Sequence, residues 1–386
     1  MLFSPRPFSR RSLGRVLRDA AFIAAVSCPT IASPARLALQ RAAESEKSIS
    51  SRALLCAAKA TIFRYFSAGE TVNDVSRMAG ELEVDGVRLI ADCSTEECEG
   101  KTVAERRANL KGKFDLLNRI KSDACLERCV DFVPIKVSSF TDLDRVSEND
   151  IDEAESELAS LCAAAQQMGL QLLLDAEQSH RQAAADTLAL RLMKRFNVPG
   201  SKPVLYNTYQ MYLKCGLQRL QSHNEACESA GSSFAAKLVR GAYLHAERQR
   251  ARQLHDTTSP CFDTKDETDA SYDDAVTYML GRGANCIIAT HNLKSVECAV
   301  SAMLERGISP DDPRIHFAQI SGMSDHVTLK LASSNFNVHK LVLFGTFEDL
   351  FPWMLRRVEE NEDVLGASRE HKDALLSELR ARFTLF

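Results

Sequence analysis

Eight short runs of β-forming residues recur along the chain, and most of them end in polar side chains. They lie at residues 87–92, 132–138, 171–175, 203–207, 234–240, 286–290, 315–319 and 338–344. Helical patterns separate the runs, and several begin after Asp, Ser or Asn, which cap helix N-termini. Strands that alternate with helices form a parallel sheet. Eight such units over roughly 260 residues match the size of a (β/α)8 barrel, and no GxGxxG fingerprint of an open dinucleotide-binding sheet accompanies them. We therefore expect an α/β barrel.

The first residues have the composition of a mitochondrial targeting peptide. Arginines at positions 6, 10, 11, 15 and 18 precede the first acid, Asp19, and serines lie among them. Leu13, Val16 and Leu17 form a helical stripe opposite the arginines. The apolar run 20–32 is shorter than the roughly 20 residues of a membrane-spanning helix, so we expect no transmembrane segment. We expect residues 1–45 to be a targeting peptide or disordered, 46–86 to be a helical segment, and 87–386 to be the barrel.

Charge and cysteine usage exclude two kinds of protein. The net charge is -4, and the barrel region has no cluster of basic residues, which argues against a nucleic-acid-binding face. The twelve cysteines form no CxxC pair and have no histidines at zinc spacing. We expect neither a structural zinc nor a disulfide scaffold.

Polar residues stand where the predicted strands end, which is where barrel enzymes carry their active sites. They are Lys136, Asp175, Glu177, Asn207, Arg240, Tyr243, Thr290, His291 and Gln319. Lys136 is a cation inside an apolar run, where an unpaired charge is unfavourable. It could form a Schiff base, hold an anion, or pair with Asp175 in the barrel core. Asp175 and Glu177 could bind a metal, but no histidine or third acid lies at suitable spacing, so we expect none.

The stretch KLVRGAY, residues 237–243, suits a site for a large anionic cofactor. It combines fixed cations, a glycine that allows close backbone approach and an aromatic residue with a polar tip. Four further motifs lie elsewhere in the chain: NTYQ at 207–210, TDASY at 268–272, ATHN at 289–292 and RRVEEN at 356–361. Together these motifs resemble the proline dehydrogenase family, FAD-dependent enzymes with a distorted (β/α)8 barrel. The resemblance runs from about Ala53 to the C-terminus and is closest to the eukaryotic mitochondrial branch.

The resemblance implies a set of site residues. The expected FAD contacts are Asn207, Gln210, Lys237, Val239, Arg240, Gly241, Thr268, Thr290, His291, Asn292 and Gln319. Lys136, Arg356 and Arg357 would hold the substrate carboxylate, with Arg356 and Arg357 on a final helix that covers the barrel mouth. Asp175, Tyr243, Leu341 and Glu360 would shape the ring pocket, with Glu177 supporting Asp175. Glu70 would pair with Arg356 to gate the site.

One position departs from the family pattern. Proline dehydrogenases have a tyrosine in the eighth strand, and the hydroxyproline enzyme has a serine there, but this chain has Leu341. Leucine keeps an apolar contact and offers no partner for a 4-hydroxyl group. This argument favours proline over hydroxyproline as the substrate.

The resemblance thus implies oxidation of L-proline to Δ1-pyrroline-5-carboxylate, the first step of proline catabolism. It also implies ubiquinone as the electron acceptor and peripheral association with the matrix side of the mitochondrial inner membrane. Alternatives are an aldolase that uses Lys136, a dehydrogenase for another cyclic or N-alkyl amino acid, including hydroxyproline, and a catalytically silent homologue that acts as a binding protein.

Overall fold

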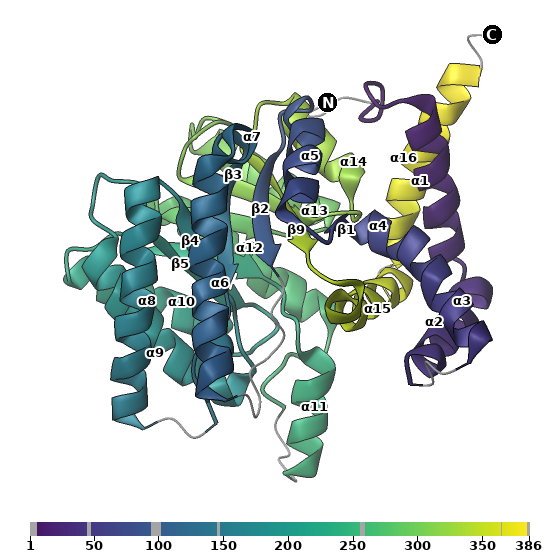
Figure 1. Cartoon of the computed structure of the whole chain (residues 1–386). Coiled ribbons are helices and arrows are strands. Elements are labelled where there is room, and N and C mark those ends of the chain that lie inside the picture. The colour runs from purple at the N-terminus through teal and green to yellow at the C-terminus, as the bar shows by residue number, and fades with distance from the viewer. Residues whose placement is uncertain are drawn as a thin grey trace. The chain divides into compact units, whose positions relative to one another are not determined.

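The computed structural model describes residues 6–44, 48–93, 102–144, 147–254, 259–363 and 365–383. The chain divides into two compact units (Figure 1). Unit 1 comprises residues 1–94 and 319–386, and unit 2 comprises residues 95–318.

Unit 2 is an alternation of parallel strands and helices. Its strands are β3 (Val130–Ile135), β4 (Gln171–Leu174), β5 (Leu205–Gln210), β6 (Ala235–Val239), β7 (Asn285–Ala289) and β8 (Ile315–Ile320), which crosses the unit boundary. Each of these strands pairs in parallel with the next one along the chain. The carboxyl ends of β3 to β7 therefore share one edge, where side chains from different strands can meet.

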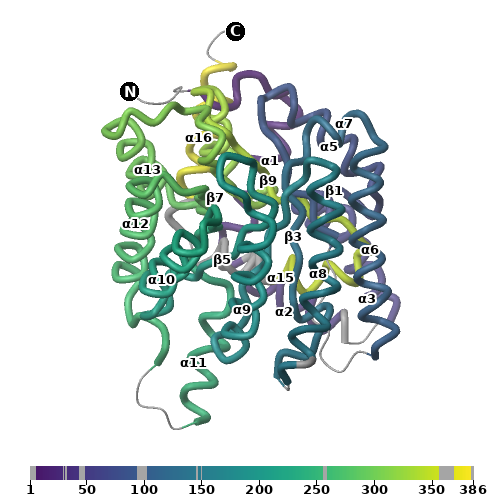
Figure 2. The backbone as a smooth tube through the Cα atoms, turned by 90° about the vertical axis from the view of Figure 1, so that its left-hand side faces the viewer, coloured from purple at the N-terminus to yellow at the C-terminus, as the bar shows by residue number. Residues whose placement is uncertain are grey.

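Helices pack on the outer side of these strands (Figure 2). They are α6 (Val103–Ser122), α7 (Ala124–Cys129), α8 (Glu148–Met168), α9 (Ser179–Phe196), α10 (Gly216–Ser229), α12 (Lys265–Arg282) and α13 (Leu293–Glu305). Helix α11 (Leu244–Gln253) projects away from the strands (Figure 1). Reciprocal capping boxes begin α6 at Thr102, α8 at Ser147 and α12 at Thr264. These caps satisfy backbone N–H groups that the first turn of a helix leaves unpaired.

Unit 1 carries the remaining strands and both chain ends. Strand β9 (Val338–Phe344) pairs in parallel with β2 (Arg88–Cys93) and with the short β1 (Ser67–Gly69). The N-terminal helices are α1 (Leu13–Val26), α2 (Pro29–Glu44), α3 (Ile49–Ala58), a π-helical turn (Lys59–Phe63), α4 (Arg64–Phe66) and α5 (Val72–Glu83). The C-terminal helices are α14 (Asp325–Ser333), α15 (Phe347–Asp363) and α16 (Leu365–Phe383). Helix α1, purple in Figure 1, lies beside α16, yellow.

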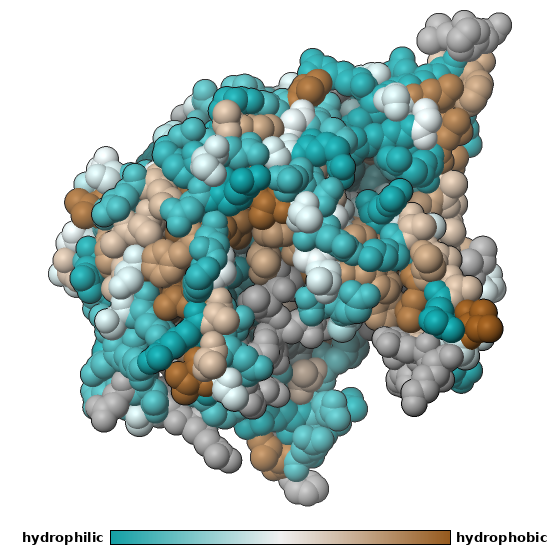
Figure 3. Space-filling model, in the orientation of Figure 1, coloured by the Kyte–Doolittle hydropathy of each residue, from teal (hydrophilic) through white to brown (hydrophobic). Residues whose placement is uncertain are grey.

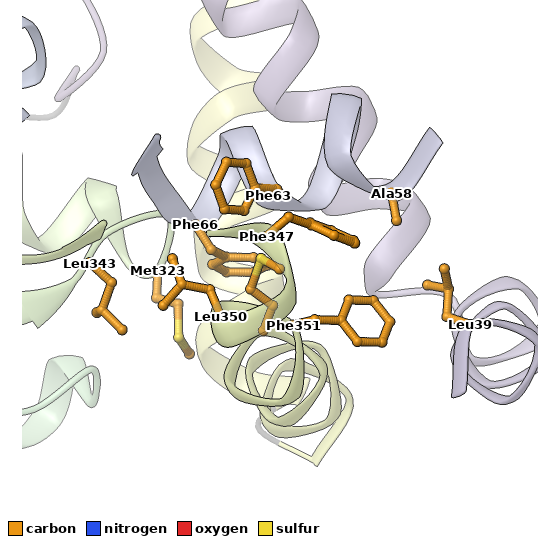
Figure 4. Close-up of a cluster of buried hydrophobic side chains, with 10 residues drawn as sticks. Leu39, Ala58, Phe63, Phe66, Met323, Leu343, Phe347, Leu350 and Phe351 are labelled. Atoms are coloured by element: carbon orange, nitrogen blue, oxygen red, sulfur yellow. The ribbon is translucent and has the colours of Figure 1, made fainter. Parts of the chain in front are cut away.

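An apolar cluster joins the N-terminal helices of unit 1 to α15. Leu39, Phe63 and Phe66 pack with Phe347 and Phe351 in this cluster (Figure 4). Four α15 residues, Phe347, Leu350, Phe351 and Met354, are buried at helical spacing and form one apolar face. The position of α15 within unit 1 is therefore set by side chains that lie near the start of the chain.

Some apolar side chains of the N-terminal helices remain on the surface. Leu13 and Leu17 of α1, Leu37 of α2 and Ile49 of α3 are exposed, and apolar residues are visible over this region in the space-filling view (Figure 3). Within the described part of the chain, no helix combines the length and the apolar character needed to cross a membrane.

All eight predicted strands are present, and β9 has the predicted bounds. Strand β5 extends to Gln210, beyond the predicted end at residue 207, and the following helix α10 begins at Gly216. Residues 13–26 and 29–44, within the segment predicted to be a targeting peptide or disordered, are helices. The buried stripe of α1 is Val16, Ala20, Ile23 and Val26, whereas Leu13 and Leu17 are exposed.

Candidate active site

A partly buried ion pair spans the strand ends of unit 2. Lys237, on β6, pairs with Asp175, which directly follows β4, so the contact crosses the intervening strand β5. Side chains alternate across a strand, so Lys237 and Val239 share one face of β6, and Leu238 points to the other. Contacts between alternate strands are typical of the interior of a barrel. The pair holds a carboxylate and an ammonium close together at the carboxyl ends of the strands.

Lys136 is a second cation at the same edge. Strand β3 ends at Ile135, and Lys136 begins the short 3-10 turn that follows it. The backbone N–H of Asp175 donates to the carbonyl of Ile135 at 2.8 Å, so Lys136 and Asp175 leave neighbouring strands side by side. Among the residues that the structure describes, the partly buried ammonium of Lys136 has no hydrogen-bond or ion-pair partner. The alternative of a Lys136–Asp175 salt bridge is wrong, because Asp175 pairs with Lys237.

Asp175 also keeps one oxygen available. Its Oδ1 contacts Lys237, whereas its Oδ2 has no partner in the described part of the chain. An unpartnered ammonium and an unpartnered carboxylate oxygen thus follow adjacent strands. This combination can receive a zwitterion, because each charged end of the ligand then meets a group of opposite charge.

The loop that carries Asp175 is held from several sides. Glu177 is buried, and its carboxylate accepts a bond from the backbone N–H of Ser138 at 3.2 Å. Glu247 of α11 accepts bonds of 2.5 Å from both the backbone N–H and the hydroxyl of Ser179, at the start of α9. These bonds agree with the supporting role predicted for Glu177 and add Glu247 to it.

Asn207 and Gln210 were expected to contact the cofactor, but protein groups use their side-chain amides. Gln210 donates to the carbonyl of Glu177 at 2.9 Å and accepts from the backbone N–H of Ala242 at 3.1 Å. It thereby joins the loop after β4 to the loop after β6. Asn207 donates to Asp186 at 2.9 Å and is fully buried. Their observed contacts are those of supporting residues.

Arg240 is clamped by polar groups from two outer helices and the end of β7. Its guanidinium donates to Asp269 of α12 at 2.7 Å, to the hydroxyl of Thr290 at 2.6 Å and to the hydroxyl of Ser295 at 2.9 Å. It also lies over the ring of Tyr272, 4.5 Å from the ring centroid. Burial raises the pKa of Asp269, but Lys265 and Arg240 outweigh it and leave that pKa below its usual value. Three of the five guanidinium N–H groups are used, and no partner is found for the other two among the described residues.

Gly241 follows Arg240 in a conformation that a side chain would block. Its φ is +145°, and a Cβ atom built there would lie 1.3 Å from Cε1 of the Tyr212 ring. The buried Tyr212 ring therefore packs directly against the backbone of the loop. Tyr243, predicted to shape the ring pocket, is the N-cap residue of α11 and is partly buried.

The other predicted cofactor residues of unit 2 lie near the ends of β6 and β7. Thr290 accepts from the backbone N–H of Asn292 as well as from Arg240. Asn292 caps α13, and His291 between them is partly buried. Val239 ends β6. Thr268 of α12 donates to the carbonyl of Thr264, the N-cap residue of that helix.

The remaining predicted residues belong to unit 1. Glu70 pairs with Lys59 of the π-helical turn, and its pairing with Arg356 stays a prediction because the Arg356 side chain lies outside the described part of the structure. Leu341 is partly buried against the apolar cluster of α15, and buried Gln319 accepts a bond from Thr328 at 2.9 Å. The backbone of α15 includes Arg356, Arg357 and Glu360, but their side chains lie outside the described part of the structure.

Sequence reasoning did not find Ser295, Glu247 and Asp269 as parts of the site. Asp269 lies in the TDASY motif, and Glu247 follows KLVRGAY by one helical turn, so both had a local signal. Ser295 had no local sequence signal, because its contact with Arg240 depends on where α13 packs.

Comparisons with known proteins find one matching family model and several similar sequences. The family model described as "Proline dehydrogenase" matches residues 75–370. "Hydroxyproline dehydrogenase" of Bos taurus is 30% identical over 432 residues, covering 98% of this chain and 93% of the relative. "Proline dehydrogenase 1, mitochondrial" of Homo sapiens is 35% identical over 229 residues, covering 58% of this chain and 37% of the relative. "Hydroxyproline dehydrogenase" of Homo sapiens is 38% identical over 220 residues, covering 55% and 47%.

Solved structures extend the likeness to the fold. Proline utilization A (PutA) from Bdellovibrio bacteriovorus, inactivated by N-propargylglycine, aligns with a TM-score of 0.73 at 16% identity. The alignment covers 90% of this chain and 37% of that protein, so this chain spans well under two thirds of its length. The likeness confirms the predicted fold class, an α/β distorted (β/α)8 barrel.

Proposed function

Because the chain belongs to the proline dehydrogenase family, we propose that it oxidises L-proline to Δ1-pyrroline-5-carboxylate with FAD as cofactor. The observation that carries this proposal is the pair of unpartnered charges at the strand ends, the Lys136 ammonium and Asp175 Oδ2. Proline is a zwitterion at neutral pH. Its carboxylate would bind Lys136, and its ammonium would face Asp175.

The Lys237–Asp175 pair would fix the orientation of the bound amino acid. Lys237 contacts one carboxylate oxygen of Asp175, and the other oxygen would receive the substrate. Tight positioning of this kind accounts for a large share of enzymatic rate enhancement. The proposed oxidation requires no nucleophilic side chain, and membership of the proline dehydrogenase family argues against the aldolase alternative for Lys136.

The donor set of unit 2 fits an anionic cofactor such as FAD. Lys237 and Arg240 supply positive charge, and two N–H groups of Arg240 have no partner among the described residues. Gly241 brings the backbone close with no side chain in the way. Together with Val239, Thr290, His291 and Asn292 they would hold the cofactor, with Asn207, Gln210 and Thr268 as supports. When bound, FAD would supply the hydride acceptor for the carbon next to the proline nitrogen.

Residues of unit 1 complete the proposal. Arg356 and Arg357 would bind the substrate carboxylate by planar, paired N–H donation, and Glu360, Leu341 and Tyr243 would shape the ring pocket. Glu70 would serve as the gate partner of Arg356 once it exchanges Lys59 for that arginine. Gln319 would contact the cofactor.

Hydroxyproline is the second candidate substrate, since a relative named for it is 38% identical over 220 residues. Leu341 argues against it, because an apolar side chain leaves a substrate hydroxyl without a partner from this position. We assign proline as the preferred substrate on that ground.

We further propose a mitochondrial location, with electrons passing to ubiquinone from a protein held peripherally on the matrix side of the inner membrane. Relatives are named mitochondrial proline dehydrogenases, and the arginine-rich N-terminus suits a targeting signal.

Steady-state assays with an artificial electron acceptor test the substrate assignment. Purified full-length protein supplied with FAD is given L-proline or trans-4-hydroxy-L-proline, and the cyclic imine product is trapped with o-aminobenzaldehyde. We expect a higher kcat/KM with proline. A higher kcat/KM with hydroxyproline would reverse the assignment, and no turnover of either would favour the binding-protein alternative.

A further inference from the structure

The first described residues are built into the core of unit 1. We call residues 6–44 the N-terminal arm. Its helix α1 buries Val16, Ala20, Ile23 and Val26 in a cluster that includes Leu329 of α14 and Leu375 of α16. The spacing of these four residues, three or four apart, forms one face of the helix. If the arm were removed, Leu329 and Leu375 would lose this apolar cover.

Arginines of the arm form ion pairs with acidic residues from distant parts of the unit 1 sequence. Arg6 donates from two nitrogens to the carboxylate of Glu378, at 3.0 and 2.9 Å, and this glutamate is buried in α16. Arg382 also donates to Glu378, at 2.7 Å, and its guanidinium contacts the carbonyls of Phe8, Ser9 and Arg11. Burial raises the pKa of Glu378, but Arg6 and Arg382 outweigh it and leave that pKa below its usual value.

A second ion pair of the arm is almost fully removed from solvent. Arg11 contacts Asp85 at 2.7 Å, and their side chains are 9% and 7% exposed. Loss of one member of a buried pair leaves the other charge uncompensated, which is strongly destabilising. Phe8 stacks on the ring of His371 at 5.7 Å. Such contacts are typical of a structural segment. Removal of the N-terminal arm by cleavage would break all of them.

The other end of the arm contacts α15. Leu39 of α2 belongs to the cluster that contains Phe347, Phe351 and Met354 of α15 (Figure 4). Phe22 of α1 stacks on Tyr65 at 3.9 Å, next to the same cluster. The arm therefore holds α16 through α1 and α15 through α2.

Helix α15 is the element to which the proposed function assigns substrate binding. Its buried positions are 347, 350, 351 and 354. At 100° per residue, positions 356 and 360 fall on the opposite side of the helix from these buried positions, whereas position 357 falls about 20° from position 350, at the edge of the buried face. Packing against the arm would therefore fix the helix while leaving positions 356 and 360 on its other side.

We propose that the N-terminal arm stays in the mature folded protein and positions α15 for substrate binding. A targeting signal in this region would then be retained after import and would not be removed near residue 45. The substrate-binding part of this inference rests on the proposed function, whereas the retention of the arm does not.

Retention is tested by the intact mass of the protein isolated from its own cells. We expect a mature chain whose first residue lies at or before Arg6. A mature N-terminus beyond residue 26 would overturn the proposal, because helix α1 would then be absent.

Positioning is tested with Leu39→Ala and the matched control Leu37→Ala. Both residues lie on α2, but Leu39 is 5% exposed and Leu37 is 49% exposed. We expect Leu39→Ala to raise KM for proline between about tenfold and 100-fold, the range that small displacements of positioning groups produce, with FAD content unchanged. Hydrogen exchange in the peptide 347–363 should be faster in this variant. Leu37→Ala should match the wild type in all three measurements.

Wild-type KM and wild-type exchange in Leu39→Ala would overturn the positioning role. A merely structural role would lower stability without a selective change in KM. If the wild-type protein does not oxidise proline, the proposed function fails, and the exchange measurement still reports whether the arm holds α15.

Discussion

Replacing Gly241 by alanine tests whether the Tyr212 ring sets the loop after β6. The added Cβ would lie 1.3 Å from Cε1 and 1.4 Å from Cδ1 of that ring, so the ring or the loop must move. Two separate penalties follow. A φ of +145° is a conformation used almost only by glycine, which costs about 1–3 kcal/mol for alanine. Overpacking against the buried ring costs about 1–3 kcal/mol more, so the expected loss is about 2–6 kcal/mol in the free energy of unfolding.

A double-mutant cycle with Tyr212→Ala separates the two penalties. The tyrosine variant alone should lose about 3–5 kcal/mol, as buried aromatic residues do on truncation to alanine. In that background the colliding atoms are absent, so Gly241→Ala should cost only the backbone penalty of about 1–3 kcal/mol. Urea denaturation of the four proteins gives the interaction free energy directly. Equal losses from Gly241→Ala in both backgrounds would refute the steric argument.

Two further predictions concern charge. Lys136→Met should raise KM for proline by about 10- to 150-fold, the equivalent of a hydrogen bond to a charged group worth about 1.5–3 kcal/mol. Steady-state kinetics with Lys111→Met, an exposed lysine of α6, provides the control, and an unchanged KM in Lys136→Met would contradict the zwitterion site. Burial lowers the pKa of His371 to about 3, from about 6.5. The unfolded chain therefore binds a proton that the folded chain does not. Stability should fall by about 1.4 kcal/mol between pH 7.5 and pH 5.5 from this group. Urea denaturation at both pH values measures the loss, and an equal loss in His371→Asn would contradict the assignment.

The strands were predictable because their signal is local. A run of β-forming residues followed by polar ones locates Val338–Phe344 without knowledge of its neighbours. The start of α10 was not predictable in this way. Gln210 belongs to β5 through its pairing with Val239, which is a contact between strands.

The site was predictable as a list of residues but not as a set of contacts. Lys136, Asp175 and Lys237 were all singled out, yet the partner of Asp175 is two strands away rather than one. Strand register and side-chain alternation decide that choice, and a single sequence does not specify them. The two roles of Gln210, toward Glu177 and Ala242, have the same origin.

The contacts of the N-terminus could not be predicted from composition. Five arginines before the first acid are typical of a targeting peptide. The acids that pair with Arg6 and Arg11 are Glu378 and Asp85, far along the chain. Local composition has no information about such partners, so an integral helix and a peptide that is removed look alike in the sequence.

Anaerobic reduction of bound flavin tests the central claim most directly. Full-length protein is loaded with FAD, and its absorbance is followed on addition of L-proline, for the wild type, Lys136→Met and Lys111→Met. The account predicts that proline bleaches the oxidised-flavin spectrum of the wild type and of Lys111→Met, and that Lys136→Met requires about 10- to 150-fold more proline. Flavin that binds but is not reduced by proline in the wild type would contradict it.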